Sequence, residues 1–346
     1  MQMRTGTDLI FIVGNSRSGT TMLARILGLS SEIHSFDELH YIEQMVTGAD
    51  FSSTLPLERE KAVALMASLL SVARRGYFAK KTPEKYMGEA AELVDRTTNM
   101  TYSEILRSMM LDTAQAKGKR IACEQTPRNV FYIREILERY PHAAVVNIIR
   151  DPRDVVLSQK NKWKRRRLGG AIPRFEAWRS WMNYHPYTIS RIWTMAVGSA
   201  LGFRDNSRVL SVRYEDLVSD PESSLKAIAD HCGVPFEQTF LDVPQLGSSS
   251  RADQGTRGID KSRLAAWKQG GLGKPEIEIC ERQCRELMEE FGYEVSGIKA
   301  DRFSLVLMYL LVPVKLFGAL FFNLRRVRNL PSWISQRMSV RRAMTH

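Results

Sequence analysis

A short apolar run near the start of the chain, followed at once by a turn of small residues and an amphipathic helix, constrains the fold more than any other feature. Leu9–Gly14 (LIFIVG) has the length and unbroken hydrophobicity of a strand buried on both faces, which is typical of a parallel sheet. Apolar residues then recur at helical spacing over 20–29. A strand, a tight turn and a helix in this order form the first half of a βαβ unit.

The same alternation continues along the chain. Two further apolar runs, Ala143–Ile149 and Val209–Val212, are predicted strands. Amphipathic patterns predict helices over 57–75, 86–117, 129–140, 155–162, 174–200, 221–232 and 275–292. Strands that alternate with helices predict an α/β fold in which helices flank a central parallel sheet as three layers. We expect this domain to occupy residues 1–298.

The turn after the first strand has the composition of a phosphate-binding loop. It reads Gly14-Asn-Ser-Arg-Ser-Gly19-Thr-Thr and opens a helix. Glycines allow a ligand close to the backbone, and the free N–H groups of a helix N-terminus bind anionic oxygens. The loop is P-loop-like, but the Walker A pattern requires a lysine where Thr20 stands. The cation is Arg17, inside the loop, so phosphate binding is predicted and a nucleoside triphosphatase is disfavoured.

A second candidate anion site follows the second predicted strand. The segment Arg150-Asp-Pro-Arg-Asp-Val-Val-Leu-Ser158 begins at the strand end and continues into a helix that starts near Pro152. Arginine offers a forked, permanently charged donor for a phosphate. Ser158 lies about two turns into the helix, so its hydroxyl can face the same site as Arg150.

These two motifs resemble those of sulfotransferases that use 3′-phosphoadenosine 5′-phosphosulfate (PAPS). The run RSGTT resembles their 5′-phosphosulfate loop, in which many members carry lysine at the Arg17 position, while protein-tyrosine sulfotransferases and many bacterial members carry arginine. Arg150 and Ser158 resemble their 3′-phosphate motif. The resemblance covers about residues 9–295 and implies that PAPS, and the product PAP, contact Arg17, Ser18, Gly19, Thr20, Thr21, Arg150 and Ser158.

Sulfuryl transfer requires a base that removes the proton of the acceptor hydroxyl. The segment containing Glu38 and His40 resembles the Glu-x-His-Phe pattern of heparan sulfate sulfotransferases, in which the glutamate is the base. The spacing from Arg17 to Glu38 also matches that in tyrosine sulfotransferases. Glu38 is therefore the first candidate base, with His40 as a neighbour that orients it or contacts the acceptor, and Glu124 is the rival. Arg17 keeps its proton, so its predicted role is electrostatic.

Two further segments resemble parts of the same family. Glu124-Gln-Thr-Pro resembles the Glu-Lys-Thr-Pro segment of relatives, but Gln125 replaces the lysine that contacts the acceptor or sulfuryl group there. A lysine of the pair Lys80-Lys81 is one possible substitute. Arg257-Gly258, in the polar loop Ser248–Lys261, resembles the loop that closes over the 3′-phosphate, which implies cofactor contacts for both residues.

The positive charge is concentrated in two places. The formal charge is +12, and residues 299–346 hold nine Lys or Arg against Asp301 as their one acid. The run 160–167 (KNKWKRRR) holds six more, and it is either a solvated face or part of an anion-binding surface. Phe303–Phe322 has one charge, Lys315, and Pro313 as a helix breaker, so it barely reaches the ~20 apolar residues of a membrane span. Such a tail indicates monotopic attachment, a tail anchor or a packing helix.

Together these features predict a PAPS-dependent sulfotransferase with a hydrophobic and basic tail over 299–346. We expect the acceptor to be a hydroxyl of a membrane-associated glycan or glycolipid, with the membrane surface contacted through 303–342. The chain is expected at the cytoplasmic face of a bacterial inner membrane, or in the cytoplasm if the tail only packs on protein. No metal ligands occur in the motifs and no nucleic acid is expected. The alternatives are a tyrosine-peptide sulfotransferase, a P-loop kinase or GTPase, and a non-catalytic nucleotide-binding protein recruited to membranes.

Overall fold

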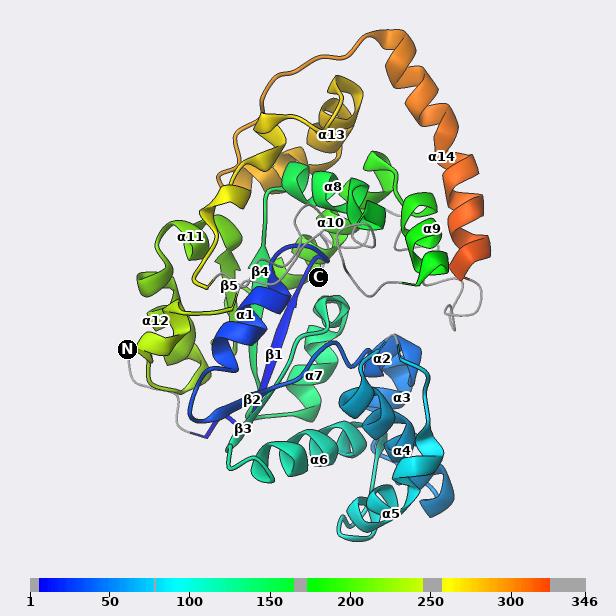
Figure 1. Cartoon of the computed structure of the whole chain (residues 1–346), viewed down its shortest axis with the longest axis vertical. Helices are drawn as coiled ribbons and strands as arrows, with labels where there is room; N and C mark the ends of the chain where they lie inside the picture. The colour runs from blue at the N-terminus through cyan, green and yellow to red at the C-terminus, as the bar shows by residue number, and fades with distance from the viewer. Residues whose placement is uncertain (1–5, 78, 165–172, 245–256, 324–346) are drawn as a thin grey trace.

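The computed structural model describes residues 6–77, 79–164, 173–244 and 257–323. They build a five-stranded parallel sheet in the order β2-β3-β1-β4-β5 (Figure 1). The strands are β1 (Leu9–Gly14), β2 (Ile33–Ser35), β3 (Ile121–Glu124), β4 (Ala144–Ile149) and β5 (Val209–Arg213). The predicted parallel sheet is confirmed, and the strands β2 and β3 were missed because three or four residues carry too little pattern.

Alternating residues of the central strand β1 enter two separate cores. Leu9, Phe11 and Val13 belong to one hydrophobic cluster, and Ile10 and Ile12 to the other. The first core is covered by α4 (Arg59–Arg75), α5 (Met87–Asp95), α6 (Tyr102–Gln115) and α7 (Ile133–Arg139), and the second by α1 (Thr20–Leu27), α11 (Tyr214–Ser219) and α12 (Pro221–Cys232). Side chains of a strand alternate between the two faces of the sheet, so helices cover both faces and the fold has three layers.

A third core supports the end of β4. It joins α8 (Pro152–Lys160), α10 (Pro186–Leu201) and α13 (Lys274–Glu290) around the fully buried Trp193. The free thiols of Cys280 and Cys284, one turn apart on α13, pack into this core. This arrangement fixes α8 at the edge of the sheet.

Two of the long predicted helices are each divided in the structure. The segment 86–117 forms α5 and α6, because Asn99 adopts φ 57° and the Thr101 side chain caps α6 by accepting from the Glu104 N–H. The segment 174–200 forms α9 (Arg174–Met182) and α10, since Pro186 disfavours helical geometry in the preceding His185. The segment 129–140 begins as a 3₁₀ turn, Pro127–Tyr132, before α7.

The predicted apolar helix in the tail is confirmed as α14 (Arg302–Asn323), with Pro313 inside it. Within the described ranges it is the one helix long and apolar enough to cross a membrane. It runs beside α9 at the edge of the molecule (Figure 1). The short helices α2 (Tyr41–Gln44) and α3 (Gly48–Ser52) complete the fold near β2.

Candidate active site

The five strands deliver their following residues to one edge of the sheet. The loop 15–19 follows β1, Glu38 lies three residues after β2, and Gln125 follows β3. Arg150 follows β4, and Tyr214 follows β5. The carboxyl ends of parallel strands are where α/β proteins place their ligands, so the fold gathers the candidate residues where a site is expected.

The loop between β1 and α1 depends on its two glycines. Gly14 adopts φ 143°, and an added Cβ would collide with the Ile148 carbonyl oxygen of β4. Gly19 adopts φ 108°, and an added Cβ would lie 2.6 Å from the ring of Tyr214. Arg17 itself holds φ 77°, a conformation that is strained for a residue with a side chain. These conformations make a tight backbone turn directly before the free N–H groups at the start of α1.

The two phosphate motifs meet directly. The Arg17 Nε donates to Ser158 Oγ on α8 at 3.0 Å, although 141 residues separate them. The Arg150 Nη1 donates to the Arg17 carbonyl oxygen at 3.4 Å. The predicted 5′ and 3′ phosphate motifs therefore form one continuous basic site.

Arg150 is held from several sides. Its guanidinium lies over the ring of Tyr214 at 4.3 Å and 3.6 Å from the carboxylate of Asp154, and its Nη2 donates to the Arg263 carbonyl oxygen at 2.8 Å. The Trp193 Nε1 donates to the Arg150 carbonyl oxygen at 2.9 Å. Tyr214 thus contacts both Gly19 and Arg150, a linking role that the sequence does not reveal.

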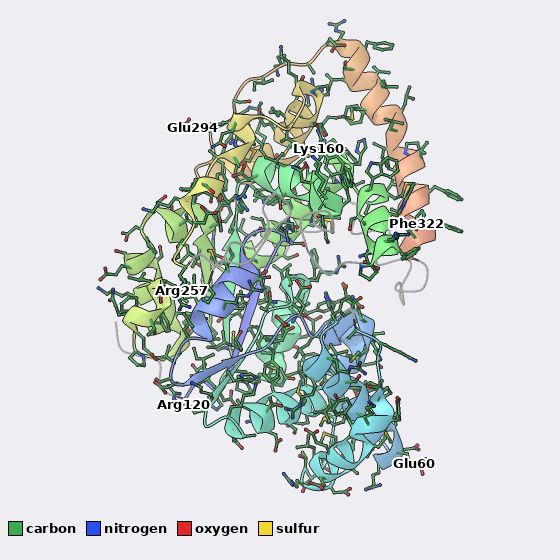
Figure 2. All side chains as sticks on the ribbon, in the orientation of Figure 1. Glu60, Arg120, Lys160, Arg257, Glu294 and Phe322 are labelled. Carbon is green, nitrogen blue, oxygen red and sulfur yellow. The ribbon has the colours of Figure 1, made fainter. Side chains whose placement is uncertain are left out.

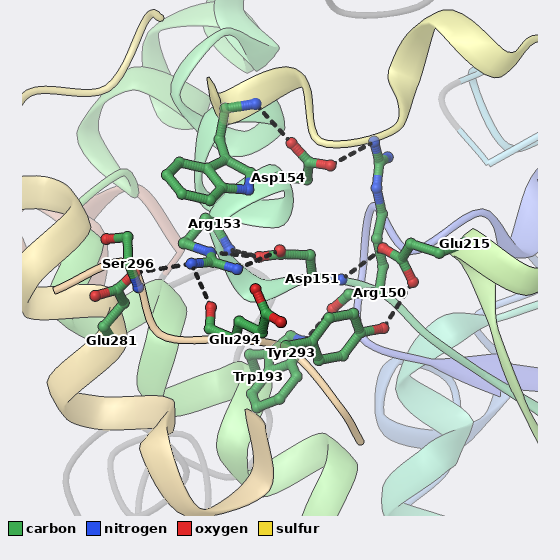
Figure 3. A network of polar contacts seen from close by, with 11 residues as sticks. Arg150, Asp151, Arg153, Asp154, Trp193, Glu215, Glu281, Tyr293, Glu294 and Ser296 are labelled. Carbon is green, nitrogen blue, oxygen red and sulfur yellow. Dashed lines mark hydrogen bonds and ion pairs between the residues drawn. The ribbon is translucent and has the colours of Figure 1, made fainter. Parts of the chain in front are cut away.

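A buried ionic network lies behind Arg150 (Figure 3). Arg153 donates to both oxygens of Asp151, at 3.0 and 2.7 Å, and to Glu281 at 2.8 Å. Glu215 accepts from the Asp151 N–H at 2.9 Å and from the Tyr293 hydroxyl at 2.7 Å. The Tyr-Glu-Asp-Leu segment after β5 therefore braces the turn at the end of β4.

Asp154 completes this support from the first turn of α8. Its carboxylate accepts from the Trp267 N–H at 2.8 Å and faces Arg150. Burial raises the pKa of Asp154 to about 6, although Arg150 and the Trp267 N–H act in the opposite direction. Asp154 orients Arg150 toward the site while ionised.

Glu38 and His40 form a pair at the mouth of the site. The His40 Nε2 lies 2.8 Å from Glu38 Oε2, and the Glu38 side chain retains 38% of its surface exposed. Burial alone would raise the pKa of Glu38, but the hydrogen bond and charge of His40, with the charges of Lys162 and Arg17, lower it overall. The carboxylate is therefore ionised near neutral pH and open to an incoming group.

Glu124, the rival base, lies in a different environment. It is 1% exposed, and its two oxygens accept from the Leu39 N–H at 3.3 Å, from the Thr126 N–H at 3.0 Å, from the Thr126 hydroxyl and from the Asn129 amide at 2.7 Å. Burial raises the pKa of Glu124, and the bonds from Thr126 and Leu39 only partly offset this. Thr126 Oγ1 also accepts from the His40 N–H at 3.1 Å. Glu124 and Thr126 together anchor the backbone that bears Glu38 and His40.

Lys162, in the turn after α8, is a site residue that the sequence reasoning missed. Burial lowers the pKa of Lys162 to about 8, and repulsion from Arg17 and Arg179 adds to this effect. The carboxylates of Glu38 and Glu176 act in the opposite direction. The side chain thus lies within electrostatic reach of both the predicted loop cation and the predicted base.

The available signal for Lys162 was its spacing. Residues four apart on a helix share a face, and Lys162 stands four residues after Ser158, in the turn that follows the end of α8 at Lys160. Its neighbour Lys160 instead pairs with Glu276 at 2.6 Å and so belongs to the support of α13. The sequence of the basic run did not show which of its lysines faces the site, because that depends on the conformation of the turn after α8.

The remaining predicted residues are distributed differently. Gln125 accepts from Thr21 Oγ1 at 3.3 Å, while Lys80 and Lys81 are both exposed. Arg257 donates to the Asp242 carboxylate and carbonyl at 2.8 and 2.7 Å, and the Gly258 N–H donates to the Val243 carbonyl. Residues 248–256 of this predicted loop lie outside the described residues. Contacts of Arg257 and Gly258 with a cofactor stay a prediction.

The sheet, the loop after its central strand and the arginine after the neighbouring strand define a P-loop-like α/β protein. A sequence model of the sulfotransferase family matches residues 8–238. The match covers about two thirds of the chain, and the chain belongs to this family. Within the described ranges, no three His, Cys, Asp or Glu side chains are grouped as metal ligands.

Individual relatives are distant. An uncharacterised protein of Aquifex aeolicus is 23% identical over 283 residues, which are 80% of this chain and 33% of that protein. The omega-hydroxy-beta-dihydromenaquinone-9 sulfotransferase of Mycobacterium tuberculosis is 23% identical over 310 residues, 82% of this chain and 75% of that enzyme. The solved sulfotransferase domain from the curacin biosynthetic pathway is 20% identical with a TM-score of 0.51, covering 84% of this chain and 99% of that one. This chain spans only a third of the Aquifex protein, and the structural likeness concerns the fold.

Proposed function

We propose that the chain transfers a sulfuryl group from PAPS to a hydroxyl of a membrane-associated acceptor. The observation that carries this proposal is the hydrogen bond from Arg17 to Ser158, with Arg150 bonded to the Arg17 carbonyl. It joins two anion-binding motifs at one edge of the sheet, which suits a nucleotide that carries phosphate groups at both its 3′ and 5′ positions. Membership of the sulfotransferase family supports the same reaction.

Buried polar atoms around the loop fit such a nucleotide. Ser18 Oγ and Arg150 Nε are buried and have no hydrogen-bond partner among the described residues. Unsatisfied polar atoms are costly unless a ligand completes them. Ser18, the backbone of the loop and Arg17 would hold the 5′ side, and Arg150 with Ser158 the 3′ phosphate. When bound there, PAPS supplies the sulfuryl group and departs as PAP.

Glu38 is the proposed general base. Its ionised carboxylate accepts the proton of the acceptor hydroxyl, and His40 at 2.8 Å holds it in place. Arg17 and Lys162 place positive charge where the departing phosphate becomes more negative. Glu124 acts through its hydrogen bonds to the Glu38 segment and is a positioning residue.

The acceptor follows from the tail. An apolar helix and a following arginine-rich sequence favour an acceptor at a membrane, and we propose a glycolipid or membrane-bound glycan at the cytoplasmic face of a bacterial inner membrane. The name of the mycobacterial relative specifies a hydroxylated menaquinone, which supports a lipid hydroxyl. A tyrosine peptide is the second candidate, because the loop carries Arg17 where tyrosine sulfotransferases do.

The test is transfer of radiolabel from PAPS into membrane, glycan and protein fractions. We expect label in the lipid or glycan fraction and a loss of about 10²–10⁴-fold in Glu38→Gln, since general-base catalysis contributes this much. The matched control is Glu60→Gln, an exposed carboxylate on α4 far from the site (Figure 2). Label in the protein fraction alone selects the peptide acceptor, and label in no fraction contradicts the proposal.

A further inference from the structure

Helix α14 presents a continuous apolar stripe to solvent. Six large side chains along it are each more than half exposed: Phe303, Val306, Leu310, Val314, Phe317 and Phe321. They recur at steps of three or four residues, so they lie on one face along the whole helix. An exposed apolar face of this length on a folded domain marks an interaction surface.

The opposite side of α14 is fixed to the domain. The contacts pair Met308 with His185, Lys315 with Trp181, Gly318 with Met182, and Phe322 with Phe175. The His185 Nε2 lies 3.0 Å from the Met308 carbonyl oxygen, and the Lys315 Nζ donates to the Trp181 carbonyl oxygen at 3.3 Å. These contacts extend from Met308 to Phe322, over about 20 Å of helix. α14 therefore lies along the domain and is not held at one end only. Figure 2 shows Phe322 at the end of this helix, beside α9.

Helix α9 has one apolar outer side and one polar inner side. Phe175 and Trp178 are 56% and 63% exposed and extend the stripe of α14. Glu176 and Arg179, on the other side, form a buried ion pair at 2.6 Å. Figure 1 shows α9 between α14 and α8, the helix that presents Ser158 to Arg17. The charges of the ion pair also act on Lys162, just beyond the end of α8. A single helix thus separates the apolar face from the catalytic groups.

We propose that α9 and α14 form one docking face for an anionic lipid bilayer, and that the acceptor hydroxyl enters the site from that bilayer past α9. The delivery step rests on the proposed sulfuryl transfer, whereas the docking face does not. Because α14 is attached along its length, it lies in the plane of the membrane surface and does not cross it. The acceptor class is then an amphiphile whose hydroxyl extends beyond its membrane-embedded part.

The charge around the face favours a bilayer over a protein partner. Lys315 lies 3.8 Å from the ring of Trp181, at the border of the stripe. The sequence that follows α14 adds six arginines between 325 and 342 and no acid. Tryptophan beside basic residues is the composition of surfaces that rest at the interface of anionic membranes.

Flotation of the full-length chain with phosphatidylglycerol-containing vesicles tests the docking face. The triple variant Trp178→Ser, Leu310→Ser and Phe317→Ser removes exposed rings and chains and leaves the α14 residues that contact the domain, Met308, Lys315, Gly318 and Phe322, in place. The wild type would bury these three side chains in the bilayer, so replacing them with serine predicts a loss of vesicle affinity of roughly a hundredfold or more. The matched control is Leu55→Ser, which is 73% exposed elsewhere and should float like the wild type. Equal flotation of the triple variant, or a wild-type chain that does not float, overturns the proposal. The proposal is also overturned if the wild type forms a dimer without binding vesicles and the triple variant disrupts that dimer.

Delivery is tested with a long-chain alkyl galactoside in the same vesicles and a short-chain alkyl galactoside in solution. We expect the triple variant to lose at least tenfold of the rate on the embedded galactoside and to keep its rate on the soluble one. Equal loss on both, or loss on neither, overturns delivery through the bilayer. PAP binding by calorimetry separates the two proposals, because a chain that floats without binding PAP refutes sulfuryl transfer and leaves the docking face standing.

Discussion

Replacing Glu124 distinguishes a structural carboxylate from a catalytic one. In Glu124→Ala, the buried N–H groups of Leu39 and Thr126 and the buried amide of Asn129 lose their acceptor. A buried donor left unsatisfied costs about 1–3 kcal/mol, so three of them predict a loss of roughly 3–9 kcal/mol in the free energy of unfolding. This is near the upper end of single-residue effects.

The variant Glu124→Gln separates stability from catalysis. Its amide oxygen can keep the donors of Leu39 and Thr126, while Asn129 can turn its own amide oxygen toward the new NH₂ group. We expect a loss of about 1 kcal/mol in the free energy of unfolding. Because the segment that bears Glu38 stays anchored, the rate should fall by less than about tenfold, whereas removal of a true base costs about 10²–10⁴-fold.

The assay pairs urea unfolding with label transfer from PAPS, with Glu38→Gln measured alongside. Glu38 is partly exposed, so its replacement should leave the unfolding free energy within about 1 kcal/mol of the wild type while the rate collapses. A Glu124→Gln protein of unchanged stability and binding that has lost a thousandfold in rate would refute this reasoning and make Glu124 the base.

Substitutions at three other positions test the same geometry. Gly19→Ala should abolish PAP binding measured by calorimetry, because its Cβ would lie 2.6 Å from the Tyr214 ring at φ 108°; unchanged affinity would contradict the loop described here. Arg17→Ala should lower the rate by roughly a hundredfold or more, and Arg17→Lys should restore part of it, since both cations meet the leaving phosphate; equal rates for the two variants would exclude that role. Lys162 has a pKa of about 8, so the pH profile of kcat/KM should fall as pH rises through about 8, and Lys162→Arg should remove the fall. In the unfolded chain Lys162 has the higher, ordinary pKa of a lysine. Between about pH 8 and that ordinary pKa the unfolded state therefore binds more protons than the folded state. The free energy of unfolding of the wild type should rise with pH over this interval, as unfolding followed by circular dichroism would report.

The fold was largely predictable because its strongest elements are local. Buried runs such as Leu9–Gly14 and Ala144–Ile149 are each followed by a helix, and this order permits few arrangements other than a parallel sheet. The short strands Ile33–Ser35 and Ile121–Glu124 were missed because each is defined by its neighbours in the sheet. β3 pairs with β1 and β2 pairs with β3, and such long-range pairing is not contained in the local pattern.

The site was predictable only where a motif includes its own geometry. The loop at Arg17 and the strand end at Arg150 each carry a recognisable pattern, but their contact depends on the pairing of β1 with β4. The competition between Glu38 and Glu124 could not be decided from residue type, because both are glutamates and each lies at or close after the end of a short strand that the local pattern did not reveal. Their difference lies in the number of hydrogen bonds each accepts and in exposure, which only the packed structure defines.

The position of Gln125 shows why a site can keep its charge while a motif changes. Relatives with lysine at this place bring a cation from β3, but here Gln125 accepts a hydrogen bond from Thr21 and so binds the first turn of α1. We propose that Lys162, in the turn after the helix that presents Ser158 to Arg17, supplies positive charge instead. A charge within electrostatic reach acts on the site from any element that supplies it, whereas a hydrogen bond needs one particular geometry. The positive field around Arg17 can therefore be maintained from another helix, while the backbone that anchors Glu38 has to keep Glu124 and Thr126 in place.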